Sequence, residues 1–401
     1  MSEKLISLSP DLKRLRDEGY AVEVRHGYLV VHSVPYANSR REVAYGKIVT
    51  KLNVNDDIAL PPGRDHQVWF SGDHPCNADG SIMKGLGNDP GHRTLCEGVE
   101  VDYQFSCKLP GGVDYPDYHA KVTEYVGIIS NQAKAIDPLG DARTFELIES
   151  ADDDSVFRYI DSASSRAGTA NVSRKLAMQR VAIVGLGGTG SYVLDLIAKT
   201  PIREIHLFDG DLFYQHNAFR APGAASIDDL KERLSKVAYF VRVYQKIRRD
   251  VIPHAEFLND ESVDKLAGFD FVFLCVDKPA VRGLLSAYLA SQGIPFVDTG
   301  MELELIEEQQ CLVGACRATT STAEKSDHFR RHVSVGNGAG DDLYASNIQV
   351  ADLNALCAVM AVIKWKKICG FYQDCIGEHQ SVYALNAHAL TCDEMTKAPP
   401  P

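Results

Sequence analysis

The residues best suited to chemistry lie at the ends of short apolar runs in the second half of the chain. Residues 185–191 read Gly-Leu-Gly-Gly-Thr-Gly-Ser and follow the apolar run 180–184. The G-x-G-x-x-G spacing suits a tight strand-to-helix turn, and the helix start behind it favours anions. Asp209 ends the next apolar run, where a carboxylate can bind a ribose. The pattern therefore predicts a nucleotide site, although a glycine turn kept only for packing has the same spacing. The candidate phosphate-side residues are Gly185, Gly187, Gly188, Gly190 and Ser191.

Further polar residues follow in an order that distinguishes between nucleotides. A dinucleotide oxidoreductase needs the ribose carboxylate and an open face for hydride transfer, but it does not need further cations. A site for a triphosphate needs Arg and Lys to neutralise phosphate charge and a carboxylate to hold Mg²⁺. The chain supplies such groups after Asp209, and they favour ATP over NAD. They are Asp211, Asn217, Arg220, Lys236 and Asp277.

This set resembles the ThiF/MoeB/ubiquitin-activating superfamily. There the glycine loop is followed by D-x-D, N-x-x-R, a helical Lys and a strand-end D-N-x-x-x-R; here Lys278 replaces the Asn. The resemblance covers roughly residues 160–392. It implies that Asp209 binds ribose, that Asn217, Arg220 and Lys236 bind phosphates, and that Asp277 binds Mg²⁺. It also implies an arginine donated from before the first strand, often across a dimer; Arg166 is the first candidate and Arg174 the second.

Each of these residues also has a purely structural interpretation. Arg220 and Asp277 could form a structural ion pair. Lys236 could lie on a solvated helix face, and Asp211 could be only a turn residue. The alternatives stay open at the level of sequence.

The cysteines depart from the pattern of many relatives. Ten are scattered along the chain without a Cys-x-x-Cys pair, so we expect reduced thiols and no structural zinc. Residues 317–347 contain no cysteine, where relatives that form a thioester usually carry one. Cys316 lies at the edge of this stretch, and we expect it to be a buried strand residue.

The elements that position the site alternate along residues 179–392. Apolar runs at 180–184, 204–209, 269–276 and 294–298 predict strands, and 191–199, 226–241 and 351–366 predict helices, the last one buried all round. Strands alternating with helices indicate an α/β fold with a doubly wound, mostly parallel Rossmann-like sheet. Residues 146–178 are expected to link this domain to the first one, and 393–401 to form a flexible tail.

Residues 1–145 predict a smaller α+β domain. A short helix after Ser9, strands at 20–24, 28–34 and 43–52, a loop region at 56–92 and a helix at 119–136 follow in order. The run from His74 to Met83 loosely resembles a ubiquitin-conjugating fold, with Met83 at the position of that family's nucleophile. Because a thioether cannot form a thioester, a strict match to that fold implies a non-catalytic variant. The alternative is that Cys76 or Cys96 takes the place of the nucleophile.

Composition limits the other classes of function. The chain has 401 residues, a formal charge of −12 and no apolar run long enough to span a membrane. This argues against non-specific nucleic-acid and membrane binding and favours a cytoplasmic protein. We expect an ATP- and Mg²⁺-dependent homodimeric adenylyltransferase that activates the C-terminal carboxylate of a ubiquitin-like or sulfur-carrier protein. An NAD(P)-dependent oxidoreductase and a non-catalytic partner-binding subunit are the alternatives.

Overall fold

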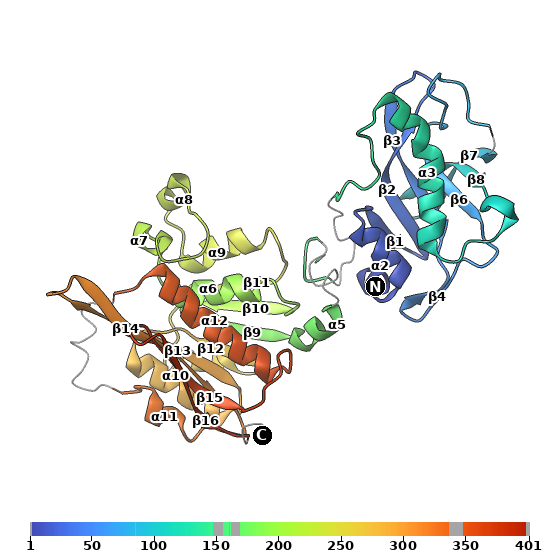
Figure 1. Ribbon diagram of the computed structural model, residues 1–401. Helices are drawn as coiled ribbons and strands as arrows, with labels where there is room; N and C mark the ends of the chain where they lie inside the picture. The colour runs from blue at the N-terminus through green and yellow to red at the C-terminus, as the bar shows by residue number, and fades with distance from the viewer. Residues whose placement is uncertain are drawn as a thin grey trace. The chain divides into compact units, whose positions relative to one another are not determined.

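A computed structural model describes residues 2–84, 86–146, 155–159, 161, 169–336 and 348–397. The chain divides into two compact units (Figure 1). The N-terminal unit comprises residues 1–155 and 159–170, and the C-terminal unit comprises residues 156–158 and 171–401. In the described part of the chain, no helix combines the length and the apolar character that crossing a membrane requires.

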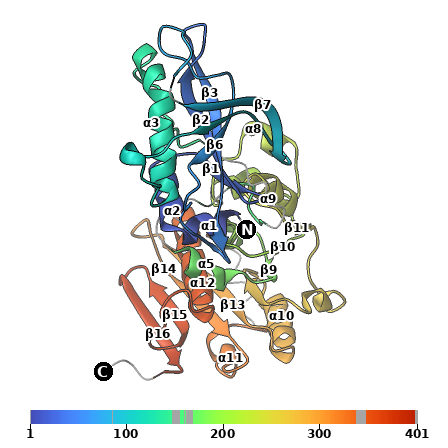
Figure 2. The same cartoon turned by 90° about the vertical axis from the view of Figure 1, so that its right-hand side faces the viewer.

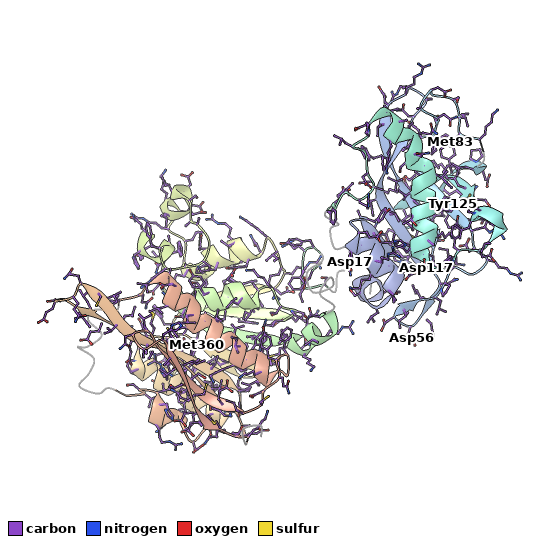
Figure 3. All side chains as sticks on the ribbon, in the orientation of Figure 1. Asp17, Asp56, Met83, Asp117, Tyr125 and Met360 are labelled. Carbon is purple, nitrogen blue, oxygen red and sulfur yellow. The ribbon has the colours of Figure 1, made fainter. Side chains whose placement is uncertain are left out.

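The N-terminal unit is an antiparallel sheet covered by helices. The strand order is β1-β2-β3-β6-β8-β7, and a separate small hairpin pairs β4 with β5. The α3 helix, predicted at 119–136, has Val122, Tyr125, Val126 and Ile129 buried against this sheet. Asp117 caps the first turn of α3 through the Ala120 N–H, and Tyr125 lies half-way along the helix (Figure 3). The elements are α1 (Ser2–Leu8), α2 (Pro10–Asp17), β1 (Val22–Arg25), β2 (Tyr28–Ala37), β3 (Val43–Lys51), β4 (Val54–Asn55), β5 (Ile58–Ala59), β6 (Gln67–Ser71), β7 (Gly87–Cys96), β8 (Val99–Ser106), η1 (Pro110–Gly112) and α3 (Tyr118–Ile136).

The prediction of a loop region at residues 56–92 was wrong. It contains β5, β6 and the start of β7. The glycines, prolines and acidic residues of this stretch suggested a loop, but Val68 and Phe70 of β6 enter the core and β8 supplies the hydrogen-bonding partner. Tertiary pairing outweighs local propensity here.

The C-terminal unit has an eight-stranded sheet of order β11-β10-β9-β12-β13-β14-β15-β16. The first five strands in this order are parallel and the last three are antiparallel. In Figure 2, β11 and the β15–β16 hairpin lie at opposite ends of the sheet. The expected α/β class, a mostly parallel Rossmann-like sheet preceded by an α+β domain, is confirmed.

Both faces of this sheet are buried, as doubly wound folds require. Val181 and Ile183 of β9 point into one cluster, which α6, α9 and α12 cover. Ala182 and Val184 point into the opposite cluster, which contains residues of α10 and α11. The elements are α5 (Ala170–Ser173), η2 (Arg174–Leu176), β9 (Arg180–Val184), α6 (Gly188–Ile197), β10 (Glu204–Phe208), α7 (Gln215–Ala218), α8 (Ile227–Lys231), α9 (Lys236–Tyr244), β11 (Val251–His254), η3 (Val263–Leu266), β12 (Phe271–Leu274), α10 (Pro279–Ser291), β13 (Phe296–Ile306), β14 (Cys311–Ser321), α11 (Phe329–His332), α12 (Ala351–Ile368), β15 (Glu378–Ala384) and β16 (Ala389–Met395).

Two helix predictions need correction. The single helix expected at residues 226–241 is two helices, because Arg233 adopts φ +50° and Ser235 starts a new cap. Ser226 and Asp229 form a capping box at the start of α8. The α12 helix is not buried all round, since Val359 and Ile363 are 38% and 40% exposed.

Candidate nucleotide site at the carboxyl edge of the sheet

The glycine loop connects β9 to α6 at the carboxyl ends of the parallel strands. Gly185 has φ +90°, and a Cβ there would lie 2.5 Å from the Cys275 carbonyl oxygen. A Cβ on Gly190 would lie 1.9 Å from the Gly185 carbonyl oxygen. A Cβ on Gly187 would meet no protein atom within 4 Å. Two of the glycines therefore let the chain turn and pack, and Gly187 leaves backbone open to a ligand.

Asp209 holds this loop in place. Its carboxylate accepts hydrogen bonds from the Leu186 N–H at 2.7 Å and from the Asp211 N–H at 2.9 Å. Asp209 is only 5% exposed, and the Lys236 ammonium lies 3.5 Å from it. The residue expected to bind ribose is therefore also the residue that connects the glycine loop to the end of β10.

Lys236 lies at the N-terminus of α9 and not in the middle of a helix. Its ammonium is buried and contacts the Asp211 carboxylate at 2.6 Å. The Lys236 backbone N–H donates to the Asp211 carbonyl oxygen, which fixes the start of the helix. Lys236 therefore does not lie on a solvated helix face. Asp211 is more than a turn residue, because the Asp211 carboxylate pairs with this buried ammonium.

Arg220 has a buried donor without a partner in the described part of the chain. Its Nε is buried and makes no hydrogen bond among the described residues. Burial lowers the pKa of the guanidinium, while the charges of Asp277 and Asp211 act to raise that pKa. No ion pair between Arg220 and Asp277 forms in the described part of the chain. The structure therefore does not support the interpretation of these two residues as a structural ion pair. A partly buried guanidinium with an unused donor is suited to an anionic ligand.

Asn217 and Ser191 both have local structural contacts. The Asn217 side chain is buried and accepts from the Tyr214 N–H at 2.9 Å, which caps α7. The Ser191 hydroxyl is fully buried and donates to the Gly188 carbonyl oxygen at 2.7 Å. These contacts shape the loops around the site, and the Ser191 hydroxyl is turned into the helix.

Asp277 follows β12 and exposes its carboxylate to solvent. Its loop is anchored by Arg282, which donates to the Val276 carbonyl oxygen at 2.7 Å and to the fully buried Asp298 at 2.9 Å. Arg317 contacts the second oxygen of Asp298 at 2.6 Å. Removing one member of such a buried charge network costs about 3–5 kcal/mol. The motif D-x-x-x-x-R, which begins at Asp277, marks Arg282 as a residue of interest. No pattern in the sequence indicates that Arg282 pairs with Asp298.

Asn354 of α12 is a further residue that sequence reasoning did not assign to the site. It is 1% exposed, and its Oδ1 accepts from the Thr189 hydroxyl at 3.0 Å. Its Nδ2 has no hydrogen-bond partner among the described residues and lies 2.1 Å from where a Gly188 Cβ would be. Only glycine at position 188 therefore admits this contact of α12 with the glycine loop.

The remaining sequence candidates are divided between described and undescribed residues. Arg166 lies outside the described residues, and Arg174 is exposed in η2. Within the described ranges, no group of three or more His, Cys, Asp and Glu side chains is arranged to hold a metal ion. A single carboxylate such as Asp277 still fits Mg²⁺, which proteins commonly hold by one or two carboxylates together with substrate phosphates.

The glycine loop, the Asp209 carboxylate that holds it, and the cations Arg220 and Lys236 that follow β10 all lie at the carboxyl edge of the sheet. The sequence model of the ThiF family matches residues 161–397, which is more than half of the chain. The chain belongs to the ThiF family. Residues 10–162 match a second family, described as a domain of unknown function, DUF6791.

One curated protein resembles part of this ThiF chain. It is the adenylyltransferase and sulfurtransferase UBA4 of Lodderomyces elongisporus, which is 29% identical over 126 residues. The match covers 30% of this chain and 26% of that protein, so the chain spans about a quarter of the length of the curated relative.

Several solved structures have a similar fold. E. coli MccB with ATP is 19% identical, with 59% of this chain and 70% of that chain covered and a TM-score of 0.44. MccB with AMPCPP and MccA is 20% identical, with coverage of 59% and 70% and a TM-score of 0.46. PaaA is 16% identical, with coverage of 56% and 75% and a TM-score of 0.42. These likenesses concern the fold alone.

Each thiol expected as a possible nucleophile is either buried or has a raised pKa. Burial raises the pKa of Cys76, and it also raises the pKa of Cys96. Cys316 is fully buried in β14, where a hydrogen bond with the Cys357 thiol lowers its pKa. Met83 packs against the core of the N-terminal unit (Figure 3). The resemblance of this unit to a ubiquitin-conjugating fold stays a prediction.

Proposed function

We propose that the protein is an ATP-dependent adenylyltransferase that activates the C-terminal carboxylate of a ubiquitin-like or sulfur-carrier protein. The observation that carries this proposal is the buried Nε of Arg220, which has no hydrogen-bond partner among the residues that the structure describes and lies at the same sheet edge as the glycine loop and Lys236. A dinucleotide site has no need of these two cations, whereas a triphosphate does.

The proposed reaction joins the carboxylate oxygen to the α-phosphorus of ATP and breaks the bond to the β-phosphate oxygen. The products are an acyl-adenylate and pyrophosphate. A free carboxylate is a poor electrophile at neutral pH, and the adenylate makes its carbonyl carbon reactive. The protein positions the reactants and stabilises the charge that develops on the phosphates.

Each residue then has a distinct role. Arg220 donates its unused N–H to phosphate oxygen, and the first turn of α6 presents backbone N–H groups to the same charge. Lys236 is paired with Asp211 at 2.6 Å, so its move to a phosphate would release that exposed carboxylate. Asp277 would hold Mg²⁺, which supplies additional neutralisation of the phosphate charge. Asp209 binds ribose with the carboxylate that also fixes the glycine loop.

A comparison of two aspartates tests the catalytic part of the proposal. Asp277→Ala should abolish pyrophosphate exchange supported by ATP and a ubiquitin-like or sulfur-carrier protein, without lowering the melting temperature. Asp260→Ala removes the same charge at another exposed position and should leave exchange unchanged. Activity of Asp277→Ala within about tenfold of wild type, roughly 1.4 kcal/mol of barrier, would show that Asp277 is peripheral.

Nucleotide choice has its own test. Mg-ATP should raise the melting temperature of the C-terminal unit, and NAD at the same concentration should not. Stabilisation by NAD alone would favour the oxidoreductase alternative. Binding of ATP without exchange for any carrier protein would favour a non-catalytic, partner-binding subunit.

The thiol environments lead to a further part of the proposal. The isolated protein should form an adenylate but no reductant-sensitive covalent complex with its carrier, because the candidate thiols are buried or have raised pKa values. A non-reducing gel with Mg-ATP and carrier measures this directly. A band that disappears on reduction, and also in one of the serine variants of Cys76, Cys96 or Cys316, would contradict this expectation and identify the nucleophile.

We also propose a homodimer in which Arg166 acts in the partner's site. Mixing Arg166→Ala and Asp277→Ala protomers should then restore part of the exchange activity, because one site of each mixed dimer has both residues. No recovery in demonstrably mixed dimers would count against an arginine donated in trans.

A further inference from the structure

Phe257 is an aromatic ring left in solvent beside the candidate ribose acid. It follows β11 and is 60% exposed, although its neighbour Leu258 is buried in the core at 4% exposure. On the other side of Phe257, Glu256 pairs with Lys265 at 2.5 Å. The residues before and after the ring are therefore anchored, and the outward position of Phe257 is set by the backbone.

The ring rests on Gly210, the residue directly after Asp209. A Cβ on Gly210 would lie 2.6 Å from both Cδ2 and Cε2 of Phe257, so a larger residue at 210 would displace the ring. The Asp209 N–H donates to the His254 carbonyl oxygen at 3.2 Å, which ties the ends of β10 and β11 together. The ring and the ribose acid are thus held on adjoining strand ends.

Lys278 approaches the same ring from the end of β12. Its ammonium lies 5.8 Å from the centroid of Phe257, near the outer limit of a cation–π contact. Lys278 is exposed, and it is the one position where the nucleotide motif of this chain has a Lys in place of Asn. A long, solvated side chain can move away from the ring and close again over a ligand.

We propose that Phe257 is the stacking platform for the purine base of the nucleotide and that Lys278 closes over this base. The inference rests on the proposed function, because it takes the ribose to be bound at Asp209. A base is one glycosidic bond from its ribose, and Phe257 presents an exposed aromatic ring against Gly210, the residue that follows Asp209. Stacking on an aromatic side chain favours the larger purine ring over a pyrimidine.

Binding of nucleotide fragments separates the base contact from the phosphate contacts. Titration calorimetry with the full chain would use Mg-ATP, AMP, Mg-CTP and Mg-tripolyphosphate. Phe257→Ala should weaken ATP and AMP about tenfold, because removing an aromatic platform costs this order per base, and should leave tripolyphosphate within about twofold of wild type. Lys278→Ala should weaken ATP about twofold to fivefold. Tyr372→Ala, which removes another exposed aromatic ring after α12, should change nothing.

A second variant adds a direct signal. Phe257→Trp should bind ATP as well as wild type does, and AMP should quench its added fluorescence. The proposal is overturned if Phe257→Ala binds ATP as wild type does, or if it weakens tripolyphosphate as much as ATP. In both cases the ATP site of the proposed function stands, since wild type still binds ATP, and pyrophosphate exchange tests the catalytic part separately. If wild type binds no ATP, the proposed function fails and this inference fails with it.

Discussion

Substituting Asp209 by Asn should destabilise the C-terminal unit even in the absence of nucleotide. The buried carboxylate accepts the Leu186 N–H at 2.7 Å and the Asp211 N–H at 2.9 Å, and Lys236 lies 3.5 Å from it. An amide offers one acceptor oxygen and directs its NH₂ group at the second donor. A hydrogen bond to a charged group contributes about 1.5–3 kcal/mol, so we expect a loss of about 2–4 kcal/mol in the free energy of unfolding.

Asp211→Asn is the matched control. Its carboxylate is 54% exposed and contacts only Lys236 among the described residues. Solvent screens this half-exposed carboxylate, and an Asn oxygen can still accept from the buried Lys236 ammonium, so this variant should lose less than about 1 kcal/mol. The two substitutions make the same chemical change two residues apart, and they differ in burial and in the hydrogen bonds that they remove.

The two tryptophans make the assay specific for one unit. Trp69 belongs to the N-terminal unit, whereas Trp365 is fully buried in α12 of the C-terminal unit. In a Trp69→Phe background, urea unfolding followed by fluorescence therefore reports on Trp365. Hydrogen exchange should also show faster exchange of the Leu186 amide in Asp209→Asn. If the two Asn variants unfold within about 0.5 kcal/mol of each other, Asp209 does not hold the glycine loop and the reasoning is refuted.

Three other predictions follow from the same structure. Gly187→Ala should fold normally and weaken Mg-ATP binding. Gly190→Ala should lower the melting temperature, because its Cβ would lie 1.9 Å from the Gly185 oxygen. Equal losses of melting temperature in the two variants would contradict the assigned roles. Hydrogen bonds from His332, Arg331 and Lys325 lower the pKa of Glu394 to about 2, so Glu394→Gln should reduce stability at pH 7. This difference should fade as pH falls from about 4.5 towards 2, and a difference that persists at pH 2 would argue against it. Burial lowers the pKa of Lys364 to about 8. The unfolded chain therefore binds more protons between about pH 8 and 10.5, so this lysine should contribute more stability as pH rises through that window; thermal melts of Lys364→Met across this range should lack that contribution.

The order of chemical groups along the chain was sufficient to predict much of the C-terminal unit. An apolar run that ends in a glycine loop or an aspartate predicts a parallel strand. Buried strands of an α/β sheet are apolar along their length, and the polar residues of the site follow their carboxyl ends. The strand 180–184 and the fold class were predictable for this reason. The capping box of Ser226 with Asp229 is likewise a local feature, since its partners are three residues apart.

Other features depended on contacts between distant residues. The break before Lys236 is set by two hydrogen bonds, from the Lys236 N–H to the Asp211 carbonyl oxygen and from the Phe213 N–H to the Leu234 carbonyl oxygen, which no helical periodicity encodes. The strand β6 lies in a stretch rich in turn residues, and only its pairing with β3 and β8 makes it part of a sheet.

The candidate site shows the same division. The sequence determined which cations and carboxylates are available and in what order. The tertiary structure decided which of them are already paired. Lys236 pairs with Asp211 and Arg282 pairs with Asp298, whereas the Nε of Arg220 keeps an unused donor among the described residues. It also placed Phe257 on Gly210 and Asn354 against Gly188. A ligand-binding charge differs from a structural one by burial and by the partners within hydrogen-bond reach, and both are properties of the folded chain.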